Sequence, residues 1–321
     1  EMRESDWSSD VCSSDLPMRE KSQVLSEFVL KIIAIVTMTF DHIGAFIVQS
    51  AYSAYFPTDS VGYAVGRVFR GIGRLSFPLF ALMLAEGMRK TKDREAYLLR
   101  IGIVWVLITA VETFFYFNTK YASFALENAF TDLIMYALFI YLIEKKGAWK
   151  GLAILPLAYI VLSFAADTSE TYALNNSLTS VWSASFPLFL RCPYSLYGFL
   201  IFLGFYYAYP LADKAIKKSV EDSGSSLEVY RTGKEYRSLV NLLGITAFLF
   251  VTVIFWGLSY LYPTADIYTM SFQTYCLLDI FLLGMYSGAR GYDKKGFRYA
   301  EYAYYPLHLA LIALIFGLVF K

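Results

Sequence analysis

Histidine, cysteine and charged residues are all scarce in this chain of 321 residues. Charged residues make up only 17% of it, whereas hydrophobic residues make up 57% and aromatic residues 18%. So little charge excludes a soluble globular protein, and so many apolar residues exclude a disordered one. The 28 Lys and Arg almost balance the 27 Asp and Glu, so the net charge of +1 gives no case for a nucleic-acid partner.

Cysteine is limited to Cys12, Cys192 and Cys276. An odd number at wide spacing argues against a disulfide framework, and no short-spaced pair suggests a zinc or redox site. We expect Cys192 and Cys276 to be small buried residues of a membrane domain, and we expect no bound metal.

The first segment, EMRESDWSSDVCSSDLP, is rich in Ser and Asp and stops at Pro17, before a typical membrane-protein start at Met18. We interpret residues 1–17 as a cloning or assembly remnant and leave them out of the functional interpretation. Residues 18–321 are expected to form a single membrane domain. Their polar stretch near 211–238 has the mixed charge of a solvated cytoplasmic loop.

Long apolar runs recur along the rest of the chain. A helix of about 20 residues crosses a bilayer core of roughly 30 Å, and about nine runs approach that length. The sequence therefore predicts an all-α, polytopic bundle of about nine transmembrane helices in a lipid bilayer. The runs lie near residues 28–50, 75–90, 97–117, 130–144, 149–166, 187–209, 239–261, 271–289 and 300–320.

Basic residues mark the cytoplasmic side of a membrane protein. With the N-terminus inside, most Lys and Arg fall in cytoplasmic segments, whereas the alternate loops at 167–185 and 262–270 contain none. We therefore predict an inside N-terminus and an outside C-terminus.

Three arginines depart from this pattern. Arg67, Arg70 and Arg74 lie in a segment assigned to the outside, at spacings that place them near one helix face. One interpretation is an amphipathic helix at the membrane interface. The other is a basic patch that faces a polar cavity and holds an anionic group.

Ionisable residues inside the apolar runs are the candidates for chemistry, because each is costly to bury near the membrane centre. Both histidines of the chain, His42 and His308, lie in such runs and close to the predicted midplane. Pro306 opens the helix backbone beside His308. Asp132, with Thr131, is expected to cap a helix start. The other candidates are Lys31, Asp41, Glu86, Glu112 and Asp279.

Lys31 and His42 are eleven residues apart. At about 100° and 1.5 Å per residue, both fall on one helix face with about 16 Å between them. A cation at the interface and an imidazole at the midplane are suited to the two ends of a long ligand, with phosphate at one end and a reacting carbonyl at the other. A lysine that simply reaches to the lipid headgroups is the alternative.

Several segments resemble the TraX family of bacterial integral membrane proteins, which is similar to the wider type 3 acyltransferases. The resemblance runs from about residue 28 to the C-terminus. The segments are LKIIAIVTMTFDHIGAF, GRLSFPLFALMLAEG, KTKDREAYLLR, GMYSGARG and YAYYPLHLALIALI. Within them, Asp41, His42 and Gly44 match the FDHIG element, Arg74, Pro78 and Glu86 the basic-FP-EG element, Pro306 and His308 the closing PLH, and Lys31 with His42 the basic-x10-His element.

The resemblance implies acetyl transfer, because founding members of the family are linked to N-acetylation of conjugative pilin. The donor would be cytoplasmic acetyl-CoA, and the acceptor an amine or hydroxyl of pilin, a glycan or a small molecule. A neutral imidazole can accept a proton near neutral pH, so His42 would be the general base or transient acyl carrier.

The resemblance also implies roles for the other candidates. His308 and Glu86 would supply a second acid or base, or orient the His42 ring. Asp41 is assigned to the catalytic residues with them. Helix geometry places it about 100° away from its neighbour His42, so we expect it to pair with a basic group on another helix rather than to orient that ring. The residues assigned to the cofactor are Lys31, Arg67, Arg70 and Arg74, with Arg89, Arg94 or Arg100 at the cytoplasmic face.

Two other classes of function stay open. A proton-coupled secondary transporter would use His42, Glu112, Asp279 and His308 as a proton relay. A structural partner of a secretion or conjugation apparatus would need neither histidine. Consumption of the acetyl-CoA thioester separates the enzyme from both.

Overall fold

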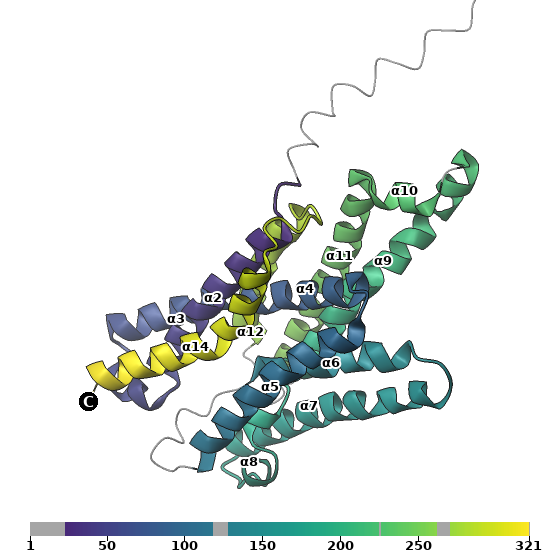
Figure 1. Ribbon diagram of the computed structural model, residues 1–321. Helices are drawn as coiled ribbons and strands as arrows, with labels where there is room; N and C mark the ends of the chain where they lie inside the picture. Colours follow the sequence, from purple (N-terminus) through teal and green to yellow (C-terminus); the bar gives the residue numbers. More distant parts are fainter. Residues whose placement is uncertain (1–22, 118–127, 225, 262–269, 321) are drawn as a thin grey trace, which may run out of the picture.

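The computed structural model describes residues 23–117, 128–224, 226–261 and 270–320 (Figure 1). Residues 1–17, with Cys12, lie outside this part, so the prediction of a remnant there stays a prediction. Within the described part the secondary structure is helical, apart from one isolated parallel bridge between Leu25 and Tyr286. The predicted all-α class is confirmed.

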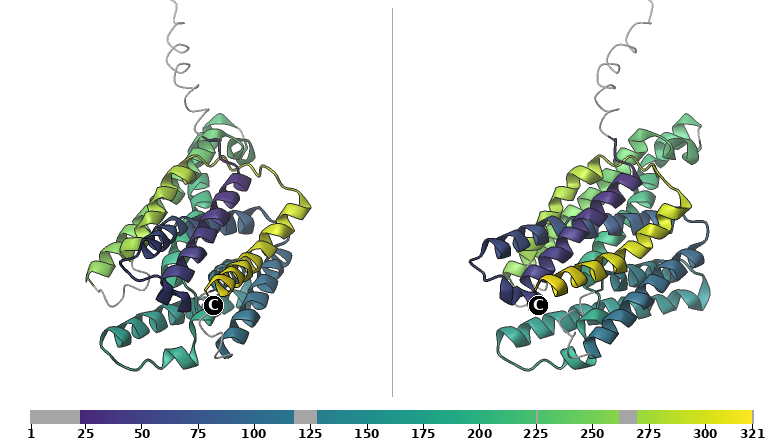
Figure 2. Two further views of the ribbon diagram at one scale, coloured as in Figure 1. Left: turned by 90° about the vertical axis from the view of Figure 1, so that its left-hand side faces the viewer. Right: turned by 60° about the vertical axis from the view of Figure 1, so that its left-hand side comes forward.

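The helices follow one another with short connections, and α4 packs between α2 and α9 (Figures 1 and 2). The α-helices are α2 (Glu27–Val48), α3 (Val61–Gly73), α4 (Ser76–Lys90), α5 (Arg94–Phe117), α6 (Ala129–Ile143), α7 (Ile154–Asn175), α8 (Trp182–Ser185), α9 (Ser195–Ser223), α10 (Leu227–Arg231), α11 (Lys234–Leu261), α12 (Met270–Gln273), α13 (Asp279–Gly284) and α14 (Lys295–Val319). The 3₁₀ helices are η1 (Ala51–Tyr55), η3 (Gly147–Ala153), η4 (Leu188–Leu190) and η6 (Thr274–Leu278).

Seven helical segments of the described chain are long and apolar enough to cross a membrane. Two shorter apolar helices, at Ala129–Ile143 and Thr274–Gly284, coincide with the two remaining runs predicted from the sequence. Multi-pass membrane character is therefore confirmed, while the number of crossings and their orientation stay predictions. The span that contains α4 begins earlier than predicted, at Val61, because the segment with the three arginines is itself helical.

Polar side chains cap the starts of α2 and α9. The Ser26 hydroxyl accepts a hydrogen bond from the amide of Val29, at 3.4 Å, where α2 begins. The carboxylate of Asp132 on α6 accepts bonds from the amides of Tyr194 (3.2 Å) and Ser195 (2.9 Å). Asp132 therefore caps a helix, as predicted, but the helix is α9 rather than its own.

Glycines allow α2 and α3 to run side by side (Figure 2). A Cβ atom at Gly44 on α2 would lie 2.6 Å from the carbonyl oxygen of Gly66 on α3. A Cβ atom at Gly73, at the end of α3, would lie 2.2 Å from the side chain of Asp41. Larger residues at these positions would overlap their neighbours, so the missing side chains are what bring α3 against α2.

Replacing Gly73 with Ala is expected to destabilise the protein by about 1–3 kcal/mol, because the added methyl group overlaps the side chain of Asp41. Thermal unfolding of the purified protein in detergent measures the change. Gly257→Ala on α11 is the matched control, since nothing lies within 4 Å of a Cβ atom there and Ala favours a helix. Equal stability of the two variants would contradict the close packing of α2 and α3.

A buried apolar cluster joins α2 and α14 near one end of both helices. Phe46 of α2 packs there with Ile312 and Phe316 of α14. Phe46 follows His42, and Ile312 follows His308, by four residues, which is about one helical turn. The cluster therefore fixes the two histidine-bearing helices against each other on one side of the histidines.

Candidate active site

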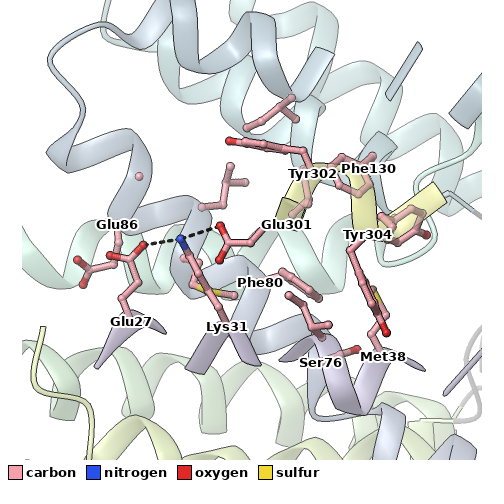
Figure 3. Close-up of a pocket in the computed structure, with 18 of the residues that line it drawn as sticks. Glu27, Lys31, Met38, Ser76, Phe80, Glu86, Phe130, Glu301, Tyr302 and Tyr304 are labelled. Carbon is pink, nitrogen blue, oxygen red and sulfur yellow. Dashed lines mark hydrogen bonds and ion pairs between the residues drawn. The ribbon is translucent and has the colours of Figure 1, made fainter. Parts of the chain in front are cut away.

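A cavity of about 420 Å³ lies between α2, α4, α5, α6 and α14 (Figure 3). Lys31 and His42 of α2 both line it. Their spacing corresponds to about 16 Å along the helix axis. The cavity therefore extends lengthwise along α2, with a cation near one end and an imidazole near the other.

The two histidines meet at the His42 end of this cavity. Nδ1 of His42 lies 2.7 Å from Nε2 of His308, and their ring centroids are 4.9 Å apart. Nδ1 of His308 lies 2.9 Å from the carbonyl oxygen of Tyr304, one turn back on α14. His42 lines the cavity, whereas His308 is 5% exposed and is not among the lining residues. The two histidines, which the sequence predicted to lie at equal depth, are therefore in direct contact.

Asp41 forms ion pairs with Arg70 of α3 and with Arg74, the residue that follows α3. The prediction that Asp41 pairs with a basic group on another helix is therefore confirmed. Arg74 also donates to the side-chain oxygen of Gln273, at 3.3 Å, and is 5% exposed. The anionic group held by this basic patch is a carboxylate of the same chain.

Arg67, Arg70 and Arg74, which were assigned to the cofactor, do not line the cavity. Arg70 and Arg74 are paired with Asp41, while Arg67 is exposed, and its guanidinium lies 5.1 Å from the ring centroid of Phe272. Their segment is a helix, as the interfacial interpretation required. Their role in cofactor binding stays a prediction, and in the structure Arg70 and Arg74 have Asp41 as their partner instead.

Lys31 lies between two carboxylates in the cavity (Figure 3). Its Nζ is 3.1 Å from Oε1 of Glu27, one turn earlier on α2, and 3.3 Å from Oε2 of Glu301 on α14. The side chain of Lys31 is still 24% exposed. Lys31 therefore links α2 to α14 and also presents part of its side chain to the cavity.

Glu86 of α4 lines the cavity but is not hydrogen-bonded to either histidine. Its carboxylate accepts a bond from Arg237 of α11, at 2.8 Å, and also contacts Lys90 and the Tyr209 hydroxyl. The residue is only 1% exposed. These contacts place Glu86 in a buried ion pair, and its predicted catalytic role has no geometric support beyond its position in the cavity wall.

Further basic and aromatic side chains line the cavity near Lys31. Lys90, Arg100 and Arg290 supply positive charge, and Tyr97 and Tyr292 supply aromatic rings. Arg100 had been predicted at the cofactor, whereas Arg290 had not, because it follows the last short apolar helix in a stretch that looks like an ordinary loop. Four carboxylates, those of Glu27, Glu86, Asp293 and Glu301, line the cavity as well, and all four pair with Lys31, Lys90 or Arg290. The Lys31 end of the cavity is therefore charged and aromatic, with cations and carboxylates in equal number.

Arg89 and Arg94 were predicted together with Arg100 and have other partners. The guanidinium of Arg89 lies 4.2 Å from the ring centroid of Tyr206, and Arg94 is paired with Glu144. Neither lines the cavity.

A comparison with protein families matches residues 26–211 to the TraX protein family. The match covers more than half of the chain and contains both Lys31 and His42. The chain belongs to the TraX family. In this TraX chain His308 lies beyond the matched residues, and the fold adds it to the site. Comparisons with curated proteins and with solved structures give no match.

The described residues of the TraX chain hold two further buried polar sites, of which Asp279 was among the candidates from the sequence and Arg191 was not. Arg191 is 1% exposed and pairs with Asp167, at 2.8 Å, and with Glu170. Asp279 is fully buried, and neither carboxylate oxygen has a hydrogen-bond partner. No three His, Cys, Asp or Glu side chains gather as a metal site in the described part.

Proposed function

We propose that this TraX-family protein transfers an acetyl group from acetyl-CoA to an amine or hydroxyl acceptor. The observation that carries the proposal is the hydrogen-bonded histidine pair at one end of an elongated cavity whose other end holds several Lys and Arg side chains among carboxylates. The bacterial inner membrane, with the Lys31 end of the cavity toward the cytoplasm, belongs to the same proposal. Pilin, a glycan and a small metabolite remain the acceptor classes.

The cavity suits the shape of the donor. Coenzyme A carries its thioester at the tip of the long pantetheine arm, with several phosphates at the other end. The volume of about 420 Å³ lies within the usual range of small-molecule sites. Lys90, Arg100 and Arg290 would face the phosphates while the acetyl group reaches His42.

His42 supplies the general base in this proposal. Its imidazole takes the proton from the acceptor hydroxyl, or from a neutral amine, as the acceptor atom bonds to the thioester carbon. The C–S bond then breaks, and the departing thiolate of coenzyme A receives the proton from His42. The acetyl group has moved, the imidazole is neutral again, and no other reactant is consumed.

The test is thioester consumption by the full chain in lipid nanodiscs. Purified protein is supplied with acetyl-CoA and a panel of amine and hydroxyl acceptors, and released thiol is measured together with the mass of each acceptor. We expect thiol release matched by a gain of one acetyl group on an acceptor. Failure to bind acetyl-CoA and to release thiol would overturn the proposal.

Replacing Lys31 with Gln is expected to weaken acetyl-CoA binding about tenfold, a loss of about 1.4 kcal/mol. The change removes a cation and leaves Glu27 and Glu301 facing an anionic ligand. Isothermal titration of the nanodisc-embedded protein measures the dissociation constant. Lys217→Gln is the control, because Lys217 is exposed and does not line the cavity. Equal affinities of the two variants would count against a ligand at Lys31.

The transporter alternative needs a relay through His42, Glu112, Asp279 and His308. The two histidines are hydrogen-bonded, but neither oxygen of Asp279 has a hydrogen-bond partner among the described residues. The elongated cavity that contains both His42 and Lys31 therefore favours the acyltransferase. Proton-coupled transport without any thioester consumption would favour the alternative.

A further inference from the structure

The hydrogen bonds of the two histidines decide which ring nitrogens carry protons. A carbonyl oxygen only accepts hydrogen bonds, so His308 must donate to Tyr304 from Nδ1. In a neutral imidazole the other nitrogen is then an acceptor, and Nε2 of His308 faces Nδ1 of His42 at 2.7 Å. Nδ1 of His42 must therefore be the donor in this bond.

We infer that His308 is a positioning residue that holds His42 in the Nδ1–H form and leaves the lone pair on Nε2 of His42 for the reaction. The use of Nε2 of His42 in a reaction rests on the proposed function, whereas the hydrogen bonds of the two histidines do not depend on it. His42 lines the cavity and His308 does not, so only His42 meets a substrate.

A doubly protonated His308 would reverse the donor roles, and the surrounding charges argue against it. His308 is 5% exposed, and its hydrogen-bond partners are a carbonyl group and a neutral ring rather than a carboxylate. The nearby carboxylate of Asp41 is already shared between Arg70 and Arg74. A further buried cation without its own anion would be costly.

The aromatic residues around the pair fix the two rings. The Tyr304 ring stacks on His308 with centroids 5.0 Å apart and planes 8° apart, and its hydroxyl is 2.7 Å from Oγ1 of Thr39 on α2. Tyr305 lies edge-on to both His42 and His308. Rotation of either imidazole would break these contacts, so the orientation that aims Nε2 of His42 away from His308 is held by packing.

His308 holds the His42 ring in one tautomer and one orientation, as the Asp carboxylate does for the histidine of a Ser-His-Asp triad, but no negative charge is buried. When His42 takes a proton on Nε2, its Nδ1–H bond to His308 becomes charge-assisted and stronger. The neutral acceptor suits a site inside the membrane, because the resting pair carries no charge that must be desolvated.

Nitrogen NMR tests the proton positions directly, because the chain contains only two histidines. The full chain, purified without a histidine tag and labelled with ¹⁵N-histidine, is reconstituted in lipid at neutral pH. Free histidine favours the Nε2–H form, whereas we expect Nδ1–H for both residues here. Assignment uses His308→Gln, which leaves His42 as the single labelled residue. Nε2–H on His42 in the parent protein would overturn the inference whatever the activity.

Kinetics of two variants test whether the bond matters. His308→Leu removes the acceptor and is expected to lower kcat for thiol release about a hundredfold while KM for acetyl-CoA changes little. His308→Gln places an amide oxygen near the position of Nε2 and is expected to restore most of kcat and the Nδ1–H form of His42. Equal losses in both variants would overturn the positioning role. An Nδ1–H pair in a protein that never consumes acetyl-CoA would instead refute the proposed function alone.

Discussion

Replacing His42 with Ala is expected to lower the rate of acetyl transfer about a thousandfold, which is the scale of a lost general base. His42 is the histidine that lines the cavity, and its neighbour His308 is turned toward it from outside the lining. The remaining imidazole, His308, lies behind the position of His42 and does not line the cavity. Since Lys31 lies about 16 Å away along α2, acetyl-CoA is expected to bind as before.

The measurement separates chemistry from binding. Thiol release gives kcat and KM, and isothermal titration gives the dissociation constant of acetyl-CoA. Val36→Ala is the matched control, because Val36 lies on the same helix, is 47% exposed and does not line the cavity. A His42→Ala variant that keeps its rate within about tenfold of the parent, with Val36→Ala unchanged, would exclude His42 as the base.

The placement of Lys31 and His42 could be predicted from the sequence because both residues belong to one helix. Helical geometry alone puts residues eleven apart on one face, and both do line one cavity. Counting from the helix ends also gave His308 the depth of His42. Depth does not give the rotation of α14 about its axis, so the hydrogen bond between the rings required the fold.

The partners of the charged residues could not be predicted in this way. Glu86 and Arg237 are 151 residues apart, and the sequence suggested catalysis for one and a cytoplasmic loop for the other. Their pairing depends on how α4 and α11 pack, which leaves no trace in local periodicity. Glu301 lies inside the predicted run 300–320, so the search for ionisable residues in apolar runs could have found it, but it lies at the polar start of that run, where charge is ordinary.

Part of the arrangement of Arg67, Arg70 and Arg74 could be predicted from their spacing in the sequence. Their spacing correctly placed them near one face of a helix, and the alternative of a patch holding an anionic group was left open. The anion is Asp41, which the sequence separately expected to pair with another helix. The arginines can reach Asp41 because small glycines let α3 approach α2 closely. Composition does not give the distance between two helices, so this pairing could not be predicted.

The ion pairs of Asp41 with Arg70 and Arg74 lead to the second prediction with a large expected effect. Replacing Asp41 with Ala is expected to destabilise the protein by about 3–5 kcal/mol, because two largely buried guanidinium groups lose their shared carboxylate. The side chains of Arg70 and Arg74 are only 17% and 6% exposed. Thermal unfolding in detergent, followed by loss of the monodisperse peak in size-exclusion chromatography, measures the change.

Two variants show whether charge pairing is the cause. Glu221→Ala breaks an ion pair with Lys217 whose side chains are 63% and 74% exposed, and it is expected to cost less than about 1 kcal/mol. The triple change of Asp41→Ala, Arg70→Leu and Arg74→Leu removes both unpaired cations and is expected to recover most of the lost stability. A triple variant as unstable as Asp41→Ala alone would mean that the side-chain packing of Asp41, rather than its charge, holds α3 against the histidine-bearing helix.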